Sequence, residues 1–140
     1  MVRVYLDASA LAKRYVREAG SPAVKAAMAH GPAATSRLSE VEVVSALARQ
    51  AREGWLSAAE RDLALAAWRS EMQRMDLIEL TATITARARV LLLRHTLRAG
   101  DAIQLASAMH LSQAAGAIAI LAYDARLCAA ARAEGLRLAV

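Results

Sequence analysis

Four acidic residues stand where a chain of alternating strands and helices could bring them together. Asp7 directly follows an apolar, β-branched stretch at the start of the chain, and Asp124 follows a second apolar stretch. Glu42 falls in the first turn of a predicted helix, and Asp101 opens another. Carboxylate oxygens are the ligands that hard divalent cations such as Mg²⁺ prefer. Such a cation can activate a water molecule and stabilise the transition state of phosphoryl transfer.

Each acid also has a purely structural interpretation. Asp is a favoured N-cap residue, and Asp7, Asp101 and Asp124 each precede a predicted helix. Ser39 and Glu42 have the S-x-x-E spacing of a capping box. Capping accounts for each acid separately, however, and does not require the four to converge. Their arrangement in the fold therefore distinguishes the two interpretations.

Strands and helices are expected to alternate along the chain. Apolar stretches bounded by turn residues predict strands at Val2–Leu6, Ala33–Arg37, Leu77–Leu80, Ala117–Leu121 and, as a last edge strand, Leu136–Val140. Helical spacing of apolar residues, with capping and breaking residues at the ends, predicts helices at Ala8–Val16, Pro22–His30, Ser39–Arg52, Ser57–Met75, Thr83–His95, Asp101–Ala114 and Ala125–Ala133. No two predicted strands are joined by a hairpin turn.

This alternation predicts one α/β domain over residues 1–140, a three-layer α/β/α sandwich around a parallel sheet of four or five strands. Sites in such open sheets form beyond the carboxyl ends of the strands. Asp7 and Asp124 follow strands directly, and Glu42 begins the helix after the second strand. We therefore expect at least these three acids to converge. Carboxylates gathered in one pocket repel one another, and a divalent cation would offset that repulsion.

Composition favours a globular domain with a polyanionic partner. The chain is 57% hydrophobic, which excludes a disordered composition, and its net charge is +5. All but two of its 18 basic residues are arginine, whose planar fork suits phosphate, although a basic surface also serves solubility alone. The N-terminus does not resemble a signal peptide, and no apolar run approaches the length of a bilayer span. We expect a cytoplasmic protein without a membrane partner.

Four segments resemble the acidic motifs of PIN domains, in order and in spacing, over the whole chain. They are Val4-Tyr5-Leu6-Asp7-Ala8-Ser9-Ala10-Leu11, Ser39-Glu40-Val41-Glu42-Val43, Arg98-Ala99-Gly100-Asp101-Ala102-Ile103-Gln104-Leu105-Ala106-Ser107-Ala108 and Leu121-Ala122-Tyr123-Asp124-Ala125-Arg126-Leu127. The third segment is the most specific. Among PIN proteins, the small single domain is most similar to the VapC toxins of bacterial and archaeal toxin–antitoxin pairs.

The resemblance implies that Asp7, Glu42, Asp101 and Asp124 are catalytic acids that hold Mg²⁺ or Mn²⁺ or position a water molecule. It implies a sheet of strand order 3-2-1-4-5 and endonucleolytic hydrolysis of RNA by a metal-activated water. It also implies a cognate antitoxin that occludes the site, and a homodimer. Ser9 would place a hydroxyl beside Asp7, although a hydroxyl at a helix start is an equally good interpretation.

Three details depart from the family pattern or stay open. The family often has Thr or Ser two residues before the fourth acid, where this chain has Ala122. Glu40 stands two residues before Glu42, and only the family pattern favours Glu42 as the site residue. Arg49, two helical turns after Glu42, and its neighbour Arg52 could contact RNA phosphates or could simply lie on a solvated helix face.

Other classes of protein fit the sequence less well. A haloacid-dehalogenase-type phosphatase would have a second Asp at position 9, where this chain has Ser9, and a response-regulator receiver would have a lysine after a late strand. The two lysines, Lys13 and Lys25, are both early. A PIN fold that binds RNA or a partner without turnover is the main alternative, and the presence of all four acids argues against it.

Overall fold

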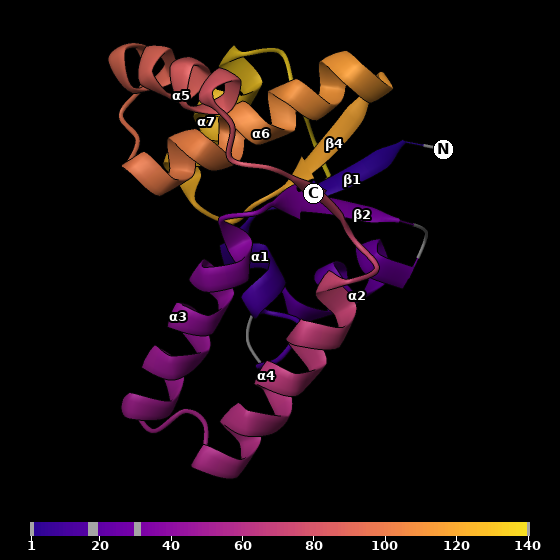
Figure 1. Cartoon of the computed structure of the whole chain (residues 1–140), viewed down its shortest axis with the longest axis vertical. Helices are drawn as coiled ribbons and strands as arrows, with labels where there is room; N and C mark the ends of the chain where they lie inside the picture. Colours follow the sequence, from indigo (N-terminus) through magenta and orange to yellow (C-terminus); the bar gives the residue numbers. More distant parts are fainter. Residues whose placement is uncertain (1, 17–19, 30–31, 140) are drawn as a thin grey trace.

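The sheet has five parallel strands, as the resemblance predicts. The computed structural model describes residues 2–16, 20–29 and 32–139. Its strands stand in the order β3-β2-β1-β4-β5, and every neighbouring pair is parallel (Figure 1). The strands are β1 (Arg3–Leu6), β2 (Ala33–Ser36), β3 (Asp76–Ile78), β4 (Ile118–Leu121) and β5 (Arg137–Leu138).

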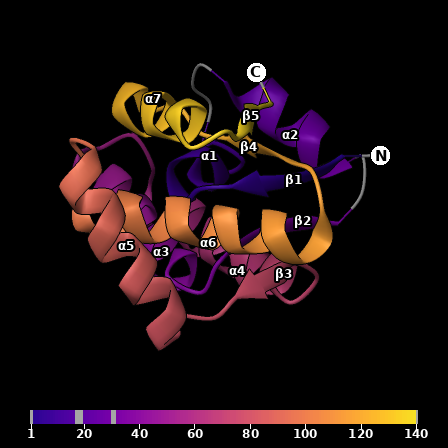
Figure 2. The same cartoon turned by 90° about the horizontal axis from the view of Figure 1, so that it is seen from above.

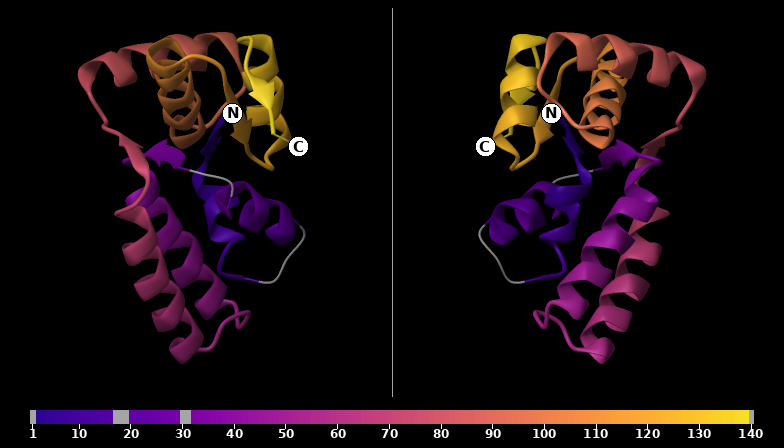
Figure 3. Two further views of the ribbon diagram at one scale, coloured as in Figure 1. Left: turned by 90° about the vertical axis from the view of Figure 1, so that its right-hand side faces the viewer. Right: turned by 90° about the vertical axis from the view of Figure 1, so that its left-hand side faces the viewer.

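Helices cover both faces of this sheet, which confirms the predicted α/β/α sandwich. They are α1 (Ala8–Ala12), α2 (Ser21–Ala29), α3 (Ser39–Arg52), α4 (Ala58–Met72), α5 (Ala82–Arg94), α6 (Ala99–Ala115) and α7 (Ala125–Ala133). Figures 1 and 3 show α5, α6 and α7 on one face and α1 to α4 on the other. Seen from above in Figure 2, α6 runs along the sheet with α5 and α7 on either side. No helix of the described ranges is long and apolar enough to cross a membrane.

Successive side chains of the central strands β1 and β4 pack into two separate hydrophobic cores, one on each face of the sheet. Tyr5 of β1 and Ile120 of β4 pack with the α5–α7 layer. Leu6 and Leu121, the next residue of each strand, pack with the α1–α4 layer. Successive side chains of a strand point to opposite faces, so a strand buried on both faces is apolar throughout. This explains why the Ala117–Leu121 prediction rested on a continuous apolar run.

Several predicted boundaries differ from the structure, mostly by one to three residues. Helix α1 ends at Ala12 rather than Val16, because the N–H groups of Lys13, Arg14 and Tyr15 each donate to the carbonyl three residues earlier in a tight 3₁₀-like turn. Helix α6 begins at Ala99, so the prediction that Asp101 starts it is wrong. The predicted ends at His30 and Val140 lie outside the described residues.

Helices α3 and α4 form a hairpin that projects away from the sheet (Figure 1). Helix α3 ends before Gly54, which has a φ of +84° that suits glycine. The predicted capping box of α4 is confirmed: Ser57 Oγ accepts from the Glu60 N–H, and Glu60 Oε1 accepts from the Ser57 N–H. Because its base lies against the sheet, the hairpin extends one wall of the site beyond the strand ends.

Candidate active site

A pocket of about 400 Å³ takes in all four predicted acids. Asp7 comes from the β1–α1 junction, Glu42 from α3, Asp101 from the first turn of α6, and Asp124 from the β4–α7 junction. Four elements that are distant in sequence thus supply one carboxylate each to what we call the acid pocket. Its other lining residues are Ala8, Ser9, Ser45, Ala46, Arg49, Arg98, Gly100 and Gln104.

Asp7 is both a helix cap and a pocket residue. Its Oδ1 accepts from the Ala10 N–H at 2.9 Å, and the Ser9 hydroxyl donates to the carboxylate at 2.9 Å. The residue is 3% exposed. Burial raises the pKa of Asp7 to about 6, the nearby Asp101 and Glu42 add to the rise, and the hydrogen bonds from Ala10 and Ser9 oppose it. An uncompensated anion here is costly, as expected where a cation would bind.

The Glu42 carboxylate is hydrogen-bonded to the buried side-chain amide of Gln104. Gln104 Nε2 donates to Glu42 Oε1 at 2.8 Å. The predicted Ser39–Glu42 capping box is wrong, because the N-cap of α3 is Leu38, without a side-chain hydrogen bond, and Ser39 lies fully buried inside the first turn. Ser39 Oγ instead lies 2.7 Å from Thr35 Oγ1. Freed from a capping role, the Glu42 carboxylate faces the pocket.

Glu40 turns away from the acid pocket. Its Oε1 lies 3.4 Å from Nη1 of Arg37, which also bonds Glu79 on the outer surface. Glu40 is not among the residues that line the pocket. The choice that the sequence left open thus goes to Glu42 on geometry.

Asp101 and Asp124 are the other two acids that line the pocket. Asp124 caps α7, since its Oδ1 accepts from the Leu127 N–H at 2.9 Å. Asp101 does not cap α6, whose N-cap is Arg98. Burial raises the pKa of Asp101 and the charge of Asp124 adds to the rise, while the Arg98 side chain and N–H lower it. Capping thus explains Asp7 and Asp124 in part, whereas neither Asp101 nor Glu42 is an N-cap residue.

The oxygen-only donor set suits a hard divalent cation such as Mg²⁺ or Mn²⁺. Within the described ranges, however, no three Asp, Glu, His or Cys side chains already stand close enough to share one ion. The carboxylates repel one another, and an ion would have to draw them inward. Gly100 leaves room for this approach, because a Cβ there would lie 2.9 Å from Glu42 Oε2.

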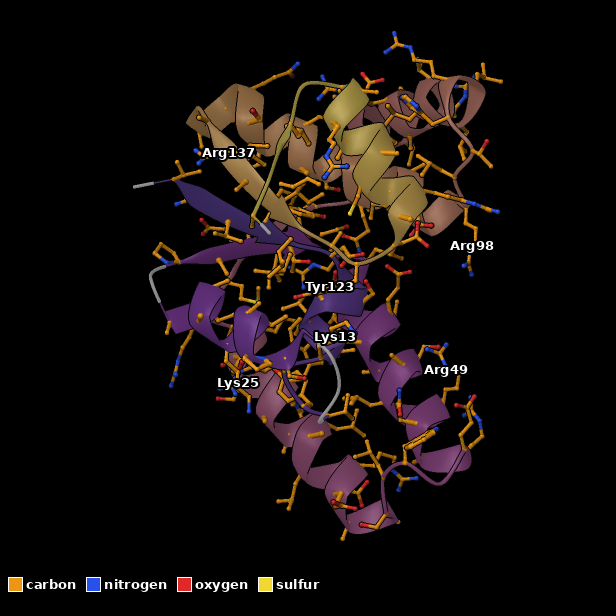
Figure 4. The ribbon with its side chains drawn as sticks, turned by 180° about the vertical axis from the view of Figure 1, so that it is seen from behind. Lys13, Lys25, Arg49, Arg98, Tyr123 and Arg137 are labelled. Atoms are coloured by element: carbon orange, nitrogen blue, oxygen red, sulfur yellow. The ribbon has the colours of Figure 1, made fainter. Side chains whose placement is uncertain are left out.

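Two arginines flank the acids. Arg49 of α3 and Arg98 at the start of α6 both line the pocket and are exposed. Figure 4 shows them on the same side of the molecule, with Arg98 above and Arg49 below. Arg52, the second predicted phosphate contact, is not among the lining residues.

Six lining residues escaped the sequence interpretation: Ala8, Ser45, Ala46, Arg98, Gly100 and Gln104. The last three lie around Asp101. The signal was present, because Arg98 lies three residues before Asp101 and Gln104 three residues after it, which puts them on neighbouring parts of one helical surface. A search along the helix around Asp101 would have found Gln104. The contact between Gly100 and Glu42 depends on how α3 and α6 pack, which no local spacing shows.

Comparison with known proteins agrees with this architecture. The family model of the PIN domain matches residues 4–133. The chain is 39% identical over 145 residues to Ribonuclease VapC45 and to Ribonuclease VapC49, each from a strain of Mycobacterium tuberculosis, covering 99% of this chain and 96% of each relative.

Two solved structures share the fold. One is a toxin–antitoxin complex from Klebsiella pneumoniae, with a TM-score of 0.62 and 18% identity over 86% of each chain. The other is VapC20 of Mycobacterium tuberculosis, described as a toxin that cleaves the sarcin–ricin loop. It has a TM-score of 0.65 and 20% identity over 91% of this chain and 94% of that chain.

Proposed function

Since this chain belongs to the PIN domain family, we propose that it is a metal-dependent endoribonuclease and the toxin of a toxin–antitoxin pair. The observation that carries the proposal is the convergence of Asp7, Glu42, Asp101 and Asp124 on one pocket from four separate elements. The 39% identity to two ribonucleases over nearly the whole chain supports the choice of RNA as substrate.

The four carboxylates would hold Mg²⁺ or Mn²⁺, and the bound ion would polarise the scissile phosphate and lower the pKa of the attacking water. The chain's own residues fix the ligands. Ser9 and the Ala10 N–H orient Asp7, and the Leu127 N–H orients Asp124. Among the described residues that line the pocket, the only hydroxyls are those of Ser9 and Ser45, and there is no histidine, cysteine or lysine to act as a nucleophile or to activate a serine. This supports water as the nucleophile.

Arg49 and Arg98 would bind phosphates of the RNA backbone. Both are exposed at the pocket, where their charge offsets the repulsion between the acids and a polyanion. Arginine presents a fork of donors that matches phosphate oxygens. Arg52 lies one helical turn beyond Arg49 on α3 and stays a weaker prediction.

The partners follow from the same assignment. A nuclease that cuts cellular RNA must be restrained in its own cytoplasm, and a cognate antitoxin that covers the acid pocket would do this. Such an antitoxin needs a basic side chain, because an arginine can pair with the carboxylates in place of the metal's charge. The structural similarity to a chain of a toxin–antitoxin complex supports this partner. We also propose a homodimer.

Cleavage of a labelled RNA pool by purified protein tests the proposal. Wild type should cut internally with Mg²⁺ or Mn²⁺ and stop when EDTA is added, and Asp7→Asn or Asp101→Asn should abolish cutting. Both variants should stay folded, since Asn caps as well as Asp at position 7 and position 101 is not a cap. Full activity in both variants with excess Mg²⁺ would rule out the site.

The alternative is a PIN fold that binds RNA or a protein without turnover. It predicts the same binding surface but no metal-dependent cleavage. RNA that is bound and remains intact in Mg²⁺ and in Mn²⁺ would favour this alternative.

A further inference from the structure

A buried amide links the core of the molecule to the acid pocket. Gln104 lies in the second turn of α6 and is 1% exposed, among apolar residues. Its Oε1 accepts from the Tyr5 hydroxyl at 2.5 Å, and its Nε2 lies 2.8 Å from Glu42 Oε1 and 3.0 Å from Ser39 Oγ. A buried amide is costly unless it is fully hydrogen-bonded, so this position demands an explanation.

The chemistry of the neighbours fixes which way the amide faces. A carboxylate only accepts hydrogen bonds, so the –NH₂ group of Gln104 must face Glu42. The amide oxygen then faces Tyr5, whose hydroxyl is obliged to donate. A tyrosine hydroxyl carries its proton at neutral pH and can donate it. A flipped amide would place oxygen against oxygen at Glu42.

The second hydrogen of the Gln104 –NH₂ group also has a single acceptor. It points to Ser39 Oγ, which must then use its own proton elsewhere. The Thr35 hydroxyl donates to the carbonyl of Leu6 at 2.7 Å, so the Ser39 hydroxyl donates to Thr35 Oγ1 at 2.7 Å. Each hydroxyl proton in this series of hydrogen bonds has one acceptor. The series ends at the carbonyl of Leu6, the last residue of β1, which directly precedes Asp7.

The network therefore leaves Gln104 one orientation and Glu42 one anchored oxygen. Glu42 Oε1 is taken by the amide. Its Oε2 lies beside Gly100, where a Cβ would be only 2.9 Å away, and both residues line the pocket. The anchored oxygen fixes the rotamer of the side chain, and the other oxygen is left for a ligand.

We propose that Gln104 is a positioning residue, which holds the Glu42 carboxylate so that its second oxygen can ligate the divalent cation. The inference rests on the proposed function and extends it to a residue outside the four acids. Hydrogen-bond partners of metal ligands contribute to affinity without touching the ion. Their loss typically costs 10- to 100-fold in metal affinity or activity.

The test replaces the amide with an apolar side chain of similar length. Gln104→Met should weaken Mn²⁺ binding, followed by electron paramagnetic resonance titration, by about 10- to 100-fold. It should also lower the melting temperature measured in EDTA, because the buried Tyr5 hydroxyl loses its acceptor. The double variant Tyr5→Phe/Gln104→Met removes that orphaned hydroxyl, and should recover melting temperature without recovering Mn²⁺ affinity.

Ser107→Ala serves as the matched control. Ser107 is a buried polar residue one turn further along α6 whose hydroxyl donates to the Ile103 carbonyl. It also lies beside the Tyr5 hydroxyl, but it contacts neither Glu42 nor the pocket, so it tests the Tyr5 end of the network alone. This variant should lose stability and keep the wild-type Mn²⁺ affinity. A separation of stability from affinity in these variants would support a positioning role, which a purely structural amide does not predict.

Two results would overturn the inference alone. One is wild-type Mn²⁺ affinity in Gln104→Met, and the other is recovery of affinity together with stability in the double variant, in each case beside a wild type that binds Mn²⁺ and cleaves RNA. A wild type that neither binds Mn²⁺ nor cleaves RNA would instead overturn the proposed function, and the inference with it. Measuring binding and cleavage on the same preparations distinguishes the two failures.

Discussion

Asp7 shows that capping a helix and serving a site are compatible roles for one carboxylate. Its Oδ1 accepts from the Ala10 N–H, and the Ser9 hydroxyl reaches both oxygens, yet the group still lines the acid pocket. The hydrogen bonds stabilise the ionised form, and burial disfavours it more strongly. The result is an anion that is held in place but not fully compensated.

This balance predicts how stability depends on pH. The pKa of Asp7 is about 6 in the folded protein, against an ordinary value of 3.8. The folded state therefore keeps a proton that the unfolded state has lost. Protonated Asp7 therefore stabilises the folded state. Its contribution to the unfolding free energy is fully present below about pH 4 and is lost as pH rises through about 6, a fall of roughly 3 kcal/mol. Asp7→Asn has no such titration and keeps the cap.

Urea unfolding at pH 4 and pH 7 in EDTA measures this difference. The unfolding free energy of wild type should fall relative to that of Asp7→Asn between the two pH values, since groups outside the acid pocket contribute equally to both proteins. If the unfolding free energies of the two proteins changed equally with pH, Asp7 would have its ordinary pKa in the metal-free pocket, which would contradict the prediction.

The individual acids could be predicted from sequence, and their support could not. Asp7 and Asp124 follow strands, so topology alone indicated where their side chains would meet. Glu42 was separated from Glu40 only by the family pattern, and the contact of Glu40 with Arg37 gives the physical reason. Gln104 was missed although it lies one turn after Asp101, because its partners on β1 and α3 become known only from the tertiary fold.

One small residue of α6 lies against the Glu42 side chain of α3. Gly100 lies in the first turn of α6, and a Cβ there would meet Glu42 Oε2 at 2.9 Å. Gly100→Ala should leave the unfolding free energy unchanged or raise it by up to about 1 kcal/mol, because alanine favours helix. RNA cleavage should fall, since the Glu42 carboxylate is pushed away from its place in the pocket.

A variant that lacks the Glu42 side chain provides the control. If Gly100→Ala acts through that carboxylate, it should have no further effect on Mn²⁺ affinity in a Glu42→Ala background, while its effect on stability persists. Unchanged cleavage in the single variant would show that Glu42 tolerates the added methyl group.

The turn that carries Asp124 is tied to the start of α2. The Tyr123 hydroxyl donates to the Gly20 carbonyl at 3.1 Å, and Lys13 Nζ lies 4.8 Å from the centre of the Tyr123 ring (Figure 4). Gly20 has a φ of +94°, and a Cβ there would lie 2.7 Å from the ring. Two independent constraints therefore require glycine at position 20.

Gly54 offers a matched comparison, because it has a φ of +84° but nothing within 4 Å of an added Cβ. Gly54→Ala should cost about 1–2 kcal/mol of unfolding free energy through backbone strain alone. Gly20→Ala should cost more and should also reduce RNA cleavage, because the displaced Tyr123 directly precedes Asp124. Thermal unfolding and cleavage assays on both variants check this, and equal behaviour of the two would contradict a link between the turn and the site.

Element boundaries were predictable where the sequence marks them locally. Helices α3 and α7 match their predicted ranges, and α4 begins at its capping box. The start of α6 was misplaced because Asp101 looks like an N-cap, whereas Arg98 takes that position without any side-chain hydrogen bond. Arginine is not a typical N-cap residue, so the sequence pattern did not mark this boundary.

Considered whole, the molecule is basic while its site is acidic. The net charge is +5, yet four carboxylates share one pocket with Arg49 and Arg98. An RNA strand is attracted by the overall charge and repelled by the metal-free acids. Arg49 and Arg98 line the acid pocket itself. They should therefore contribute most of the local attraction between the pocket and the RNA backbone.

Salt dependence measures this contribution. Each phosphate contact to single-stranded RNA adds roughly 0.7 to the slope of log affinity against log salt concentration. Arg49→Gln and Arg98→Gln, each built on the inactive Asp7→Asn protein, should therefore bind RNA more weakly and lower that slope by about 0.7 to 1.

Arg52→Gln is the matched control, because it removes the same charge from the same helix as Arg49 but outside the pocket lining. It should reduce the overall attraction slightly without removing a phosphate contact. Fluorescence anisotropy over a range of KCl concentrations gives the slopes. Equal slopes for all three variants would mean that RNA is attracted by the whole surface, and that the arginines beside the acids have no special part in guiding the strand across them.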